Sequence, residues 1–406
     1  MSEQRRIHLC LAKMSECGAE QKYIQEAFDT RWVAPLGANV DGFEEDLKQY
    51  LGGDHEVLAL ISGTAAVHLA LLLSGVGHGD DVIVQSFTFC ATANPVKYLG
   101  ATPVFVDSEP DTWNLDPDLL EHAIAERIAA TGKTPKAIVP VSLYGMPYNV
   151  EAVQQIADKY GITLVEDTAE SLGSLYRGKN LGTFGKFGVL SFNGNKMITT
   201  SGGGAIVCRG AEDKDRIMWY ATQARESYPY YQHEAIGYNY RLSNICAGIG
   251  RGQMYVADQH IAHHKHLNDL YCELFKDVPG ITVHGNPSEK FDSNFWLSTI
   301  IIDKGIRVRG QENAYRKILK GAVGGAAGVV HQSESAHTDC EPNENVEALR
   351  IALDEAGVEA RPLWKPMHVQ PVYRDNDSYD RGVAVELFKK GLCLPTGPCV
   401  SDEDAR

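Results

Sequence analysis

Apolar runs of strand length alternate with helical patterns from Val57 to about residue 210, and this alternation restricts the fold more than any other feature. The runs include "VLALIS", "DDVIVQS", "TPVFVDS", "KAIVPVSLYG" and "ITLVEDTA". Each run is apolar throughout instead of at every second position, as expected for strands that helices cover on both faces. The sequence therefore predicts an α/β domain with a mainly parallel sheet.

The pattern changes after residue 240, and this change divides the chain into two expected parts. Residues 1–240 form the N-terminal segment and the large domain, with a helix expected over 213–225. Residues 241–406 form a long bridging helix, over about 242–275, and a smaller α+β domain. Residues 305–343 have poor periodicity and indicate an insertion or a long loop. The final "SDEDAR" resembles the start of a helix, so we expect a truncated C-terminus.

Charge and composition exclude several classes of protein. The chain has 53 acidic and 38 basic residues, and its net charge of -15 repels nucleic acids and anionic membranes. No apolar run approaches the ~20 residues of a membrane span, and the polar start "MSEQRRIHLC" lacks the apolar region of a signal peptide. The nine cysteines form no Cys-x-x-Cys pair, which favours reduced thiols. We expect a cytoplasmic protein that binds no metal, no nucleic acid and no membrane.

Lys196 stands between an apolar run and three glycines in the segment "LSFNGNKMITTSGGGAIV". Taken alone, the Asn-Gly pair between two β-like runs favours a hairpin turn with a solvated lysine. The alternative is an amine in a close-packed, glycine-lined pocket, where it can form a Schiff base with a carbonyl compound. Only the rest of the sequence can decide between them.

Two further motifs provide partners for such an amine. In "ISGTAAVHLALLL", Ser62, Gly63 and Thr64 precede a helix whose free N–H groups favour a phosphate, although an ordinary N-cap explains the motif equally well. In "ITLVEDTAESLG", Glu166 and Asp167 end a strand where a carboxylate can keep a heterocyclic nitrogen protonated, or can only cap a helix. A phosphate site, an acid and a lysine together are what pyridoxal phosphate catalysis requires.

Eight motifs, within about residues 24–395, resemble those of the DegT/DnrJ/EryC1/StrS sugar aminotransferases of pyridoxal phosphate fold-type I. They are "WVAPLGANVDGFE", "ALISGTAAVHLAL", "QSFTFCATANPV", "VPVSLYGMP", "VEDTAESLGS", "SFNGNKMITTSGGG", "GYNYRLSN" and "RPLWKPMHVQPVY". The resemblance implies a large domain with a mainly parallel seven-stranded sheet between helices, plus the smaller C-terminal domain. It also favours the catalytic interpretation of Lys196 over the turn.

The resemblance implies a role for each cofactor residue. Lys196 holds pyridoxal 5′-phosphate as a Schiff base, and Asp167 pairs with the ring nitrogen. Glu170 stands where many relatives carry Gln or His, at the position that contacts the phenolic oxygen. Asn239 reaches the phosphate of a neighbouring subunit, so the expected unit is a homodimer with shared active sites. The remaining expected cofactor contacts are Gly63, Thr64 and Ser191 to the phosphate and Phe89 over the ring.

The resemblance also implies the reaction. We expect transfer of an amino group from L-glutamate to C4 of a nucleotide-linked 4-keto-6-deoxy sugar, with a UDP-linked N-acetylated sugar favoured, in amino-sugar biosynthesis for bacterial surface glycans. The alternatives are GDP-4-keto-6-deoxymannose, amination at C3, and a non-catalytic regulatory protein. The candidate substrate residues are Trp32, Tyr240, Arg241, Trp364, Lys365 and His368.

His260 and His264 have the i, i+4 spacing of a helical metal site. No acidic residue completes a recognisable metal motif, so we interpret them as part of a solvated helix face.

Overall fold

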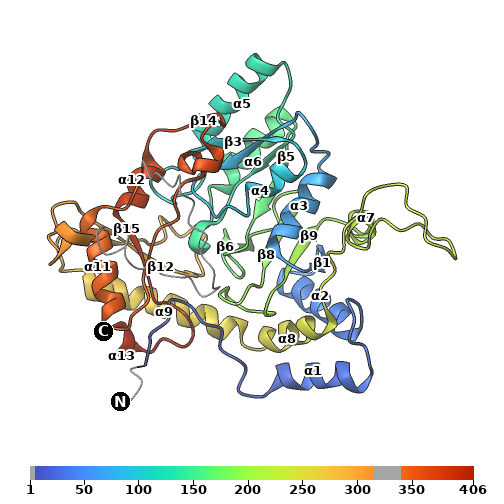
Figure 1. Ribbon diagram of the computed structural model, residues 1–406, viewed down its shortest axis with the longest axis horizontal. Coiled ribbons are helices and arrows are strands. Elements are labelled where there is room, and N and C mark those ends of the chain that lie inside the picture. The colour runs from blue at the N-terminus through green and yellow to red at the C-terminus, as the bar shows by residue number, and fades with distance from the viewer. Residues whose placement is uncertain (1–4, 315–339) are drawn as a thin grey trace.

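An eight-stranded sheet forms the centre of the larger part of the molecule (Figure 1). The computed structural model describes residues 5–314 and 340–406. In spatial order the strands are β1 (Glu56–Leu60), β9 (Gly204–Cys208), β8 (Phe187–Ser191), β5 (Thr163–Asp167), β4 (Ala137–Val139), β2 (Asp81–Gln85), β3 (Thr102–Val106) and β14 (Ser378–Tyr379). Only β9 runs antiparallel to its neighbours. The sheet is mainly parallel, as predicted, but β14 adds an eighth strand to the expected seven.

Helices cover both faces of this sheet, which explains why the strands are apolar throughout. Val82 and Val84 of β2 pack in one hydrophobic cluster, whereas Ile83 between them packs in another on the opposite face. The first cluster contains residues of α3 (Gly63–Leu73) and α7 (Ala211–Ala221). The second contains residues of α5 (Pro117–Thr131) and α6 (Val150–Tyr160), and α2 (Ala38–Tyr50) packs on the same sheet near β1.

A second, four-stranded antiparallel sheet forms the core of the smaller domain. Its order is β10 (Ile281–Val283), β12 (Ser298–Ile302), β15 (Gly391–Leu394) and β13 (Arg361–Pro362). Among the described residues that follow β12, the α-helices are α11 (Glu344–Glu355), α12 (Val383–Lys390) and α13 (Asp402–Ala405). The final "SDEDAR" does begin a short helix, which Ser401 caps. Of the stretch 305–343, for which a long loop was expected, residues 315–339 lie outside the described residues.

The connection between the two domains differs from the single helix expected over 242–275. It consists of α8 (Asn244–Met254) and α9 (Ala257–Phe275), which are separated by Tyr255 and Val256. The helix expected over 213–225 also ends early, because α7 stops at Ala221. Two segments cross the expected boundary at residue 240, since Ile7 pairs with Val358 and β14 joins the large sheet. No helix within residues 5–314 or 340–406 is long and apolar enough to span a membrane.

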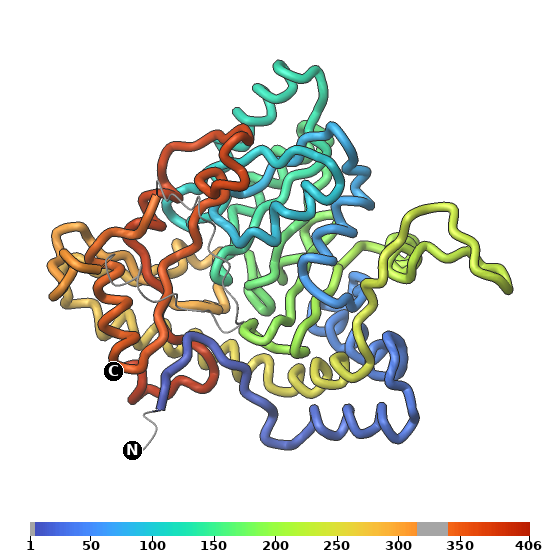
Figure 2. The backbone as a smooth tube through the Cα atoms, in the orientation of Figure 1, coloured from blue at the N-terminus to red at the C-terminus, as the bar shows by residue number. Residues whose placement is uncertain are grey.

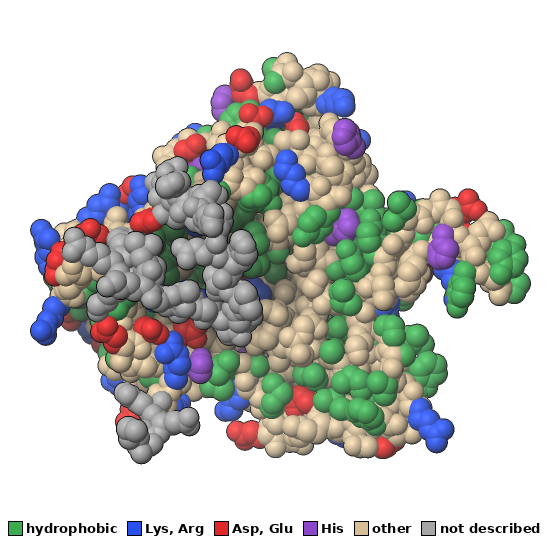
Figure 3. Space-filling view, in the orientation of Figure 1, with side chains coloured by type: hydrophobic (Ala, Val, Ile, Leu, Met, Phe, Trp, Pro, Cys, Tyr) green, Lys and Arg blue, Asp and Glu red, His purple; other side chains and the backbone are tan. Residues whose placement is uncertain are grey.

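An arm, residues 222–240, projects from the large domain beyond α7 (Figures 1 and 2, yellow-green). Its two sides contact each other through isolated bridges between Thr222 and Asn239 and between Arg225 and His233. Hydrophobic side chains gather at its tip (Figure 3). Tyr231, which lies beyond the Arg225–His233 bridge, is 79% exposed, and Ile236, between the two bridges, is 83% exposed. The arm therefore presents apolar surface that this chain does not cover.

Candidate functional site

A cavity of about 340 Å³ opens where β5 and β8 end, at the edge where parallel sheets commonly bind ligands. The segment that follows β1 and the glycines that precede β9 reach the same edge. Seven of the eight predicted cofactor residues line this cavity, together with one predicted substrate residue. They are Gly63, Thr64, Phe89, Asp167, Glu170, Ser191, Lys196 and Trp364.

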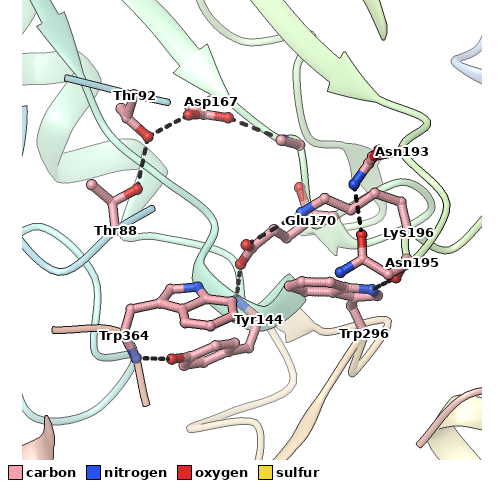
Figure 4. Close-up of polar contacts among 12 residues, drawn as sticks. Thr88, Thr92, Tyr144, Asp167, Glu170, Asn193, Asn195, Lys196, Trp296 and Trp364 are labelled. Atoms are coloured by element: carbon pink, nitrogen blue, oxygen red, sulfur yellow. Dashed lines mark hydrogen bonds and ion pairs between the residues drawn. The ribbon is translucent and has the colours of Figure 1, made fainter. Parts of the chain in front are cut away.

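Lys196 lies in the loop 192–203, which connects two antiparallel neighbours, β8 and β9. The Asn-Gly pair does form a turn, because the Lys196 N–H donates to the Asn193 carbonyl at 2.9 Å. This turn lies inside the loop and does not join two paired strands as a hairpin would, since β8 and β9 separate after Ser191 and Gly204. The Lys196 side chain is largely buried, with Nζ 3.3 Å from Glu170 Oε1 and 3.9 Å from the ring centroid of Trp296. The amine is thus held inside the cavity by a carboxylate and an aromatic face (Figure 4).

Asp167 and its neighbour Glu166 point to opposite faces of β5, because side chains alternate along a strand. Glu166 accepts backbone N–H bonds from the segment 182–185, away from the cavity. Asp167 faces the cavity, where its Oδ2 accepts a 2.6 Å hydrogen bond from Thr92 Oγ1. Thr92 in turn contacts Thr88 at 2.7 Å (Figure 4). Because side chains alternate along β5, Glu166 binds backbone N–H groups on one face, while Asp167 faces the cavity on the other.

Burial raises the pKa of the Asp167 carboxyl, although the hydrogen bond from Thr92 and the charge of Lys196 both oppose this effect. A buried carboxylate is stabilised when a cation approaches it. A protonated ring nitrogen is a group of that kind.

The start of α3 combines an N-cap with free donors. Ser62 Oγ accepts a hydrogen bond from the N–H of Ala65, so the ordinary capping interpretation is correct for Ser62. Among the described residues, the N–H groups of Gly63 and Thr64 have no hydrogen-bond partner and lie at the cavity. A Cβ at Gly63 would stand 3.0 Å from the Cβ of Ser191, so only glycine leaves room for a ligand beside that serine. This geometry fits a phosphate.

Glu170 connects Lys196 to residues that the sequence analysis did not identify. Its Oε2 accepts a 2.7 Å hydrogen bond from the backbone N–H of Tyr144, whose φ is 55°. The hydroxyl of Tyr144 accepts a hydrogen bond from the N–H of Trp364 at 2.7 Å. Trp296 contacts the loop 192–203 as well, since its Nε1–H donates to the carbonyl of Asn195. Burial raises the pKa of Glu170, while the charge of Lys196 lowers it.

The predicted substrate residues are scattered. Trp364 lines the cavity, and its ring lies 6.1 Å from that of Phe89, which is 55% exposed. Lys365 and His368 follow Trp364 outside the cavity lining, and His368 Nδ1 lies 2.6 Å from Ser86 Oγ. Trp32 is half-exposed at the surface, away from this lining.

The "GYNYR" segment at the base of the arm divides into exposed and buried residues. Asn239 is exposed and does not line the cavity of its own chain. Tyr240 is partly buried, with its hydroxyl 3.2 Å from His68 Nδ1. Arg241 requires a correction, because it is buried, pairs with Glu44 at 2.6 Å and donates to a backbone carbonyl of β1. Its charge is compensated inside the protein, and it does not line the cavity.

The interpretation of His260 and His264 as a solvated helix face is wrong. Both are buried in α9, with His260 Nδ1 3.3 Å from the carbonyl of Met197 and His264 Nδ1 3.2 Å from that of Phe295. Within the described ranges no group of three or more His, Cys, Asp or Glu side chains is arranged to hold a metal ion.

Comparisons with known proteins agree with this arrangement. The sequence matches the DegT/DnrJ/EryC1/StrS aminotransferase family over residues 15–337 and 328–406. The protein EpsN of Bacillus subtilis (strain 168) is 41% identical over 404 residues, covering 98% of this chain and 93% of EpsN. The GDP-perosamine synthase of Escherichia coli O157:H7 is 33% identical over 389 residues, covering 95% of this chain and 92% of that protein.

A solved structure shows the same fold over nearly the whole chain. The crystal structure of a DegT DnrJ EryC1 StrS aminotransferase from Brucella abortus superimposes with a TM-score of 0.81 at 27% identity, covering 96% of this chain and 92% of that one. The fold and the family resemblance predicted from the sequence are therefore confirmed. The chain belongs to the DegT/DnrJ/EryC1/StrS family of sugar aminotransferases, and its cofactor is pyridoxal 5′-phosphate.

Proposed function

We propose that this enzyme transfers the amino group of L-glutamate to C4 of a nucleotide-linked 4-keto-6-deoxy sugar, for the amino sugars of bacterial surface glycans. The observation that carries the proposal is the position of Lys196, whose amine shares one buried cavity with Asp167 and with the free N–H groups at the start of α3. A lysine, an acid and an anion site at these positions support pyridoxal phosphate catalysis.

The bound cofactor supplies an electron sink for the carbanion formed at the donor's α-carbon. In our proposal Lys196 holds the cofactor covalently, and once freed its amine moves the proton at that α-carbon. Asp167 keeps the ring nitrogen protonated, and Ser191 with the N–H groups of Gly63 and Thr64 binds the phosphate. The aromatic ring of Phe89 orients the cofactor from the open side of the cavity.

Glu170 contributes to the position of Lys196 in the same proposal. Its two carboxylate oxygens contact different groups, the Lys196 amine and the N–H of Tyr144. This pairing fixes where the lysine amine lies before the cofactor binds. A carboxylate here also adds negative charge beside the cofactor's phenolic oxygen, so we expect Glu170 to take up a proton in the loaded enzyme.

The active unit in our proposal is a homodimer in which each site uses residues of both chains. Asn239 is exposed at the base of the arm and does not line the cavity of its own chain, which supports a contact to the cofactor phosphate of another molecule. The apolar tip of the arm and a second hydrophobic area over α1 (Ala19–Asp29) and α2 provide surface for such a contact (Figure 3). Phe28 of α1 and Trp32, in the segment between α1 and α2, are exposed hydrophobic residues of this region.

Two sugars are candidates for the acceptor. The segment "RPLWKPMHVQPVY", which places Trp364 at the cavity, resembles that of enzymes acting on either sugar, and our first candidate is the UDP-linked N-acetylated 4-keto sugar. The similarity to a GDP-perosamine synthase over 95% of this chain favours GDP-4-keto-6-deoxymannose as the second candidate.

A direct assay distinguishes them. The purified protein, loaded with pyridoxal phosphate, is incubated with glutamate and each keto sugar, and the products are identified by mass spectrometry. We expect one amino sugar formed for each 2-oxoglutarate released, with NMR placing the nitrogen on C4. Nitrogen on C3 would correct the position, and turnover of the GDP sugar alone would select the second candidate. If glutamate leaves the visible absorbance of the bound cofactor unchanged and neither sugar reacts, the proposal fails.

A further inference from the structure

His68 lies on α3 one turn after Thr64, outside the residues that line the cavity, and packs against the base of the arm. Only 4% of its surface is exposed. Three tyrosine rings surround its imidazole at steep angles, with centroids at 5.7 Å for Tyr98, 4.8 Å for Tyr238 and 5.9 Å for Tyr240. Two of these tyrosines flank Asn239 in the sequence. His68 is therefore packed against the segment that presents Asn239.

Backbone hydrogen bonds hold that segment in an extended conformation. The N–H of Tyr238 donates to Tyr220 at 2.7 Å, and the N–H of Tyr240 donates to Ala221 at 3.0 Å. The Tyr238 and Tyr240 rings stack on each other with centroids 4.9 Å apart. Because side chains alternate along an extended segment, Asn239 points away from these two rings and is exposed. The inward tyrosines thus determine where Asn239 is presented.

The imidazole makes one polar contact to this segment. His68 Nδ1 lies 3.2 Å from the hydroxyl of Tyr240, while Nε2 is buried without a hydrogen-bond partner among the described residues. Burial lowers the pKa of His68. An unpartnered buried nitrogen costs stability, so a hydrocarbon side chain would suit the packing better. What a hydrocarbon cannot provide is the contact to the Tyr240 hydroxyl.

We propose that His68 is a positioning residue that fixes Tyr240, and through it Asn239, for the cofactor phosphate of the partner subunit. The inference rests on the proposed homodimer with shared sites. His68, which lies outside the cavity of its own chain, would thus contribute to cofactor binding in the partner subunit. His68 thus acts only through Asn239, and this dependence makes the inference testable.

A double-mutant cycle tests the inference through cofactor affinity. Pyridoxal phosphate is titrated spectroscopically into the wild-type homodimer and into the His68→Phe, Asn239→Ala and doubly substituted proteins. His68→Phe keeps a ring of similar size but loses the polar contact, so we expect the Kd to rise about fivefold. In the Asn239→Ala background the same change should add nothing, because there is no amide left to position. His68→Gln, which can hydrogen-bond to the Tyr240 hydroxyl, should recover part of the affinity.

The controls separate positioning from folding and from the proposed dimer. Tyr98→Phe keeps the ring that packs on His68 and leaves the Tyr240 contact intact, so its cofactor affinity should equal that of the wild type. Equal losses from His68→Phe with and without Asn239 would indicate a purely structural role and overturn the inference. If Asn239→Ala raises the Kd and His68→Phe leaves it unchanged, the positioning role of His68 is disproved, while the shared site remains supported. An unchanged Kd for Asn239→Ala would instead remove the shared site on which it rests.

Discussion

The cavity and the arm differ in how their polar residues are held. In the cavity, Lys196, Asp167 and Glu170 are largely buried, and each contacts a group from another element of the same chain. In the arm, most side chains are exposed, and so is Asn239 at its base. We interpret the difference as a division of work, in which one chain provides the reacting groups and another chain completes the cofactor site.

The largest expected effect concerns the cavity. Lys196→Ala should abolish transamination and the visible absorbance of the bound cofactor, because both the covalent link and the proton-transfer base are lost. Thermal unfolding should change little, since the variant removes a charge and leaves the backbone bonds of the loop in place. Lys186→Ala, at an exposed lysine next to β8, is the matched control and should keep full activity. Turnover near the wild-type rate in Lys196→Ala would disprove the assignment.

A smaller loss is expected when the ring nitrogen loses its acidic partner. Asp167→Asn should bind the cofactor yet lower kcat by about 100-fold or more, because a neutral pyridine ring stabilises negative charge poorly. Glu166→Gln is the control on the opposite face of β5, where it should lower stability by about 1–3 kcal/mol through its backbone hydrogen bonds while kcat stays close to wild type. Stopped-flow single-turnover rates with glutamate measure the first effect. An unchanged rate in Asp167→Asn would show that another acid serves the ring.

Mixing two inactive variants tests whether the arm belongs to the partner's site. Asn239→Ala should weaken cofactor binding by ~1.5–3 kcal/mol, the range for a hydrogen bond to a charged group. In a heterodimer with Lys196→Ala, one site carries both lesions and the other carries neither. A random equal mixture should therefore recover about a quarter of the wild-type sites, when assayed where Asn239→Ala alone has lost its cofactor. Absence of recovery after verified subunit exchange would place Asn239 in its own chain's site.

Local patterns in the sequence were enough to predict the strands and the ends at which the site lies. The apolar runs have helices on both faces, and Lys196, Asp167 and Gly63 meet at one sheet edge because parallel strands carry their carboxyl ends there. The same local reasoning was misleading for the Asn-Gly pair. The turn forms at residues 193–196, but it lies inside the loop between β8 and β9 instead of joining two paired strands, and the lysine beside it is largely buried.

Contacts between segments distant in the sequence could not be predicted from local patterns. Trp296 reaches Lys196 from the smaller domain, and Arg241 is neutralised by Glu44 nearly two hundred residues earlier. Neither pairing has a local signal. Thr92 is different, because it lies in a motif already singled out, "QSFTFCATANPV", and a hydroxyl in that motif was a reasonable partner to seek for a buried acid. The break between α8 and α9 lies at Tyr255 and Val256, with no proline or glycine to mark it.

The smallest expected effect is on the pH dependence of stability, and it compares the buried His264 of α9 with the exposed His233 of the arm. Burial lowers the pKa of His264 to about 3 from an ordinary value of 6.5, so below pH 6.5 the unfolded chain binds a proton that the folded chain does not. Stability should therefore fall as the pH falls, and this one group should contribute about 1.4 kcal/mol of that loss between pH 7.5 and 5.5. His264→Asn, which keeps a donor near the carbonyl of Phe295, should lose that much less over the same interval, even though its smaller side chain makes it less stable at pH 7.5. Urea unfolding at both pH values and at one protein concentration measures the difference, with His233→Asn in the exposed arm as the control. If the stabilities of wild type and His264→Asn change equally with pH, the prediction fails. His264 in α9 would then be as accessible to water in solution as His233 in the arm.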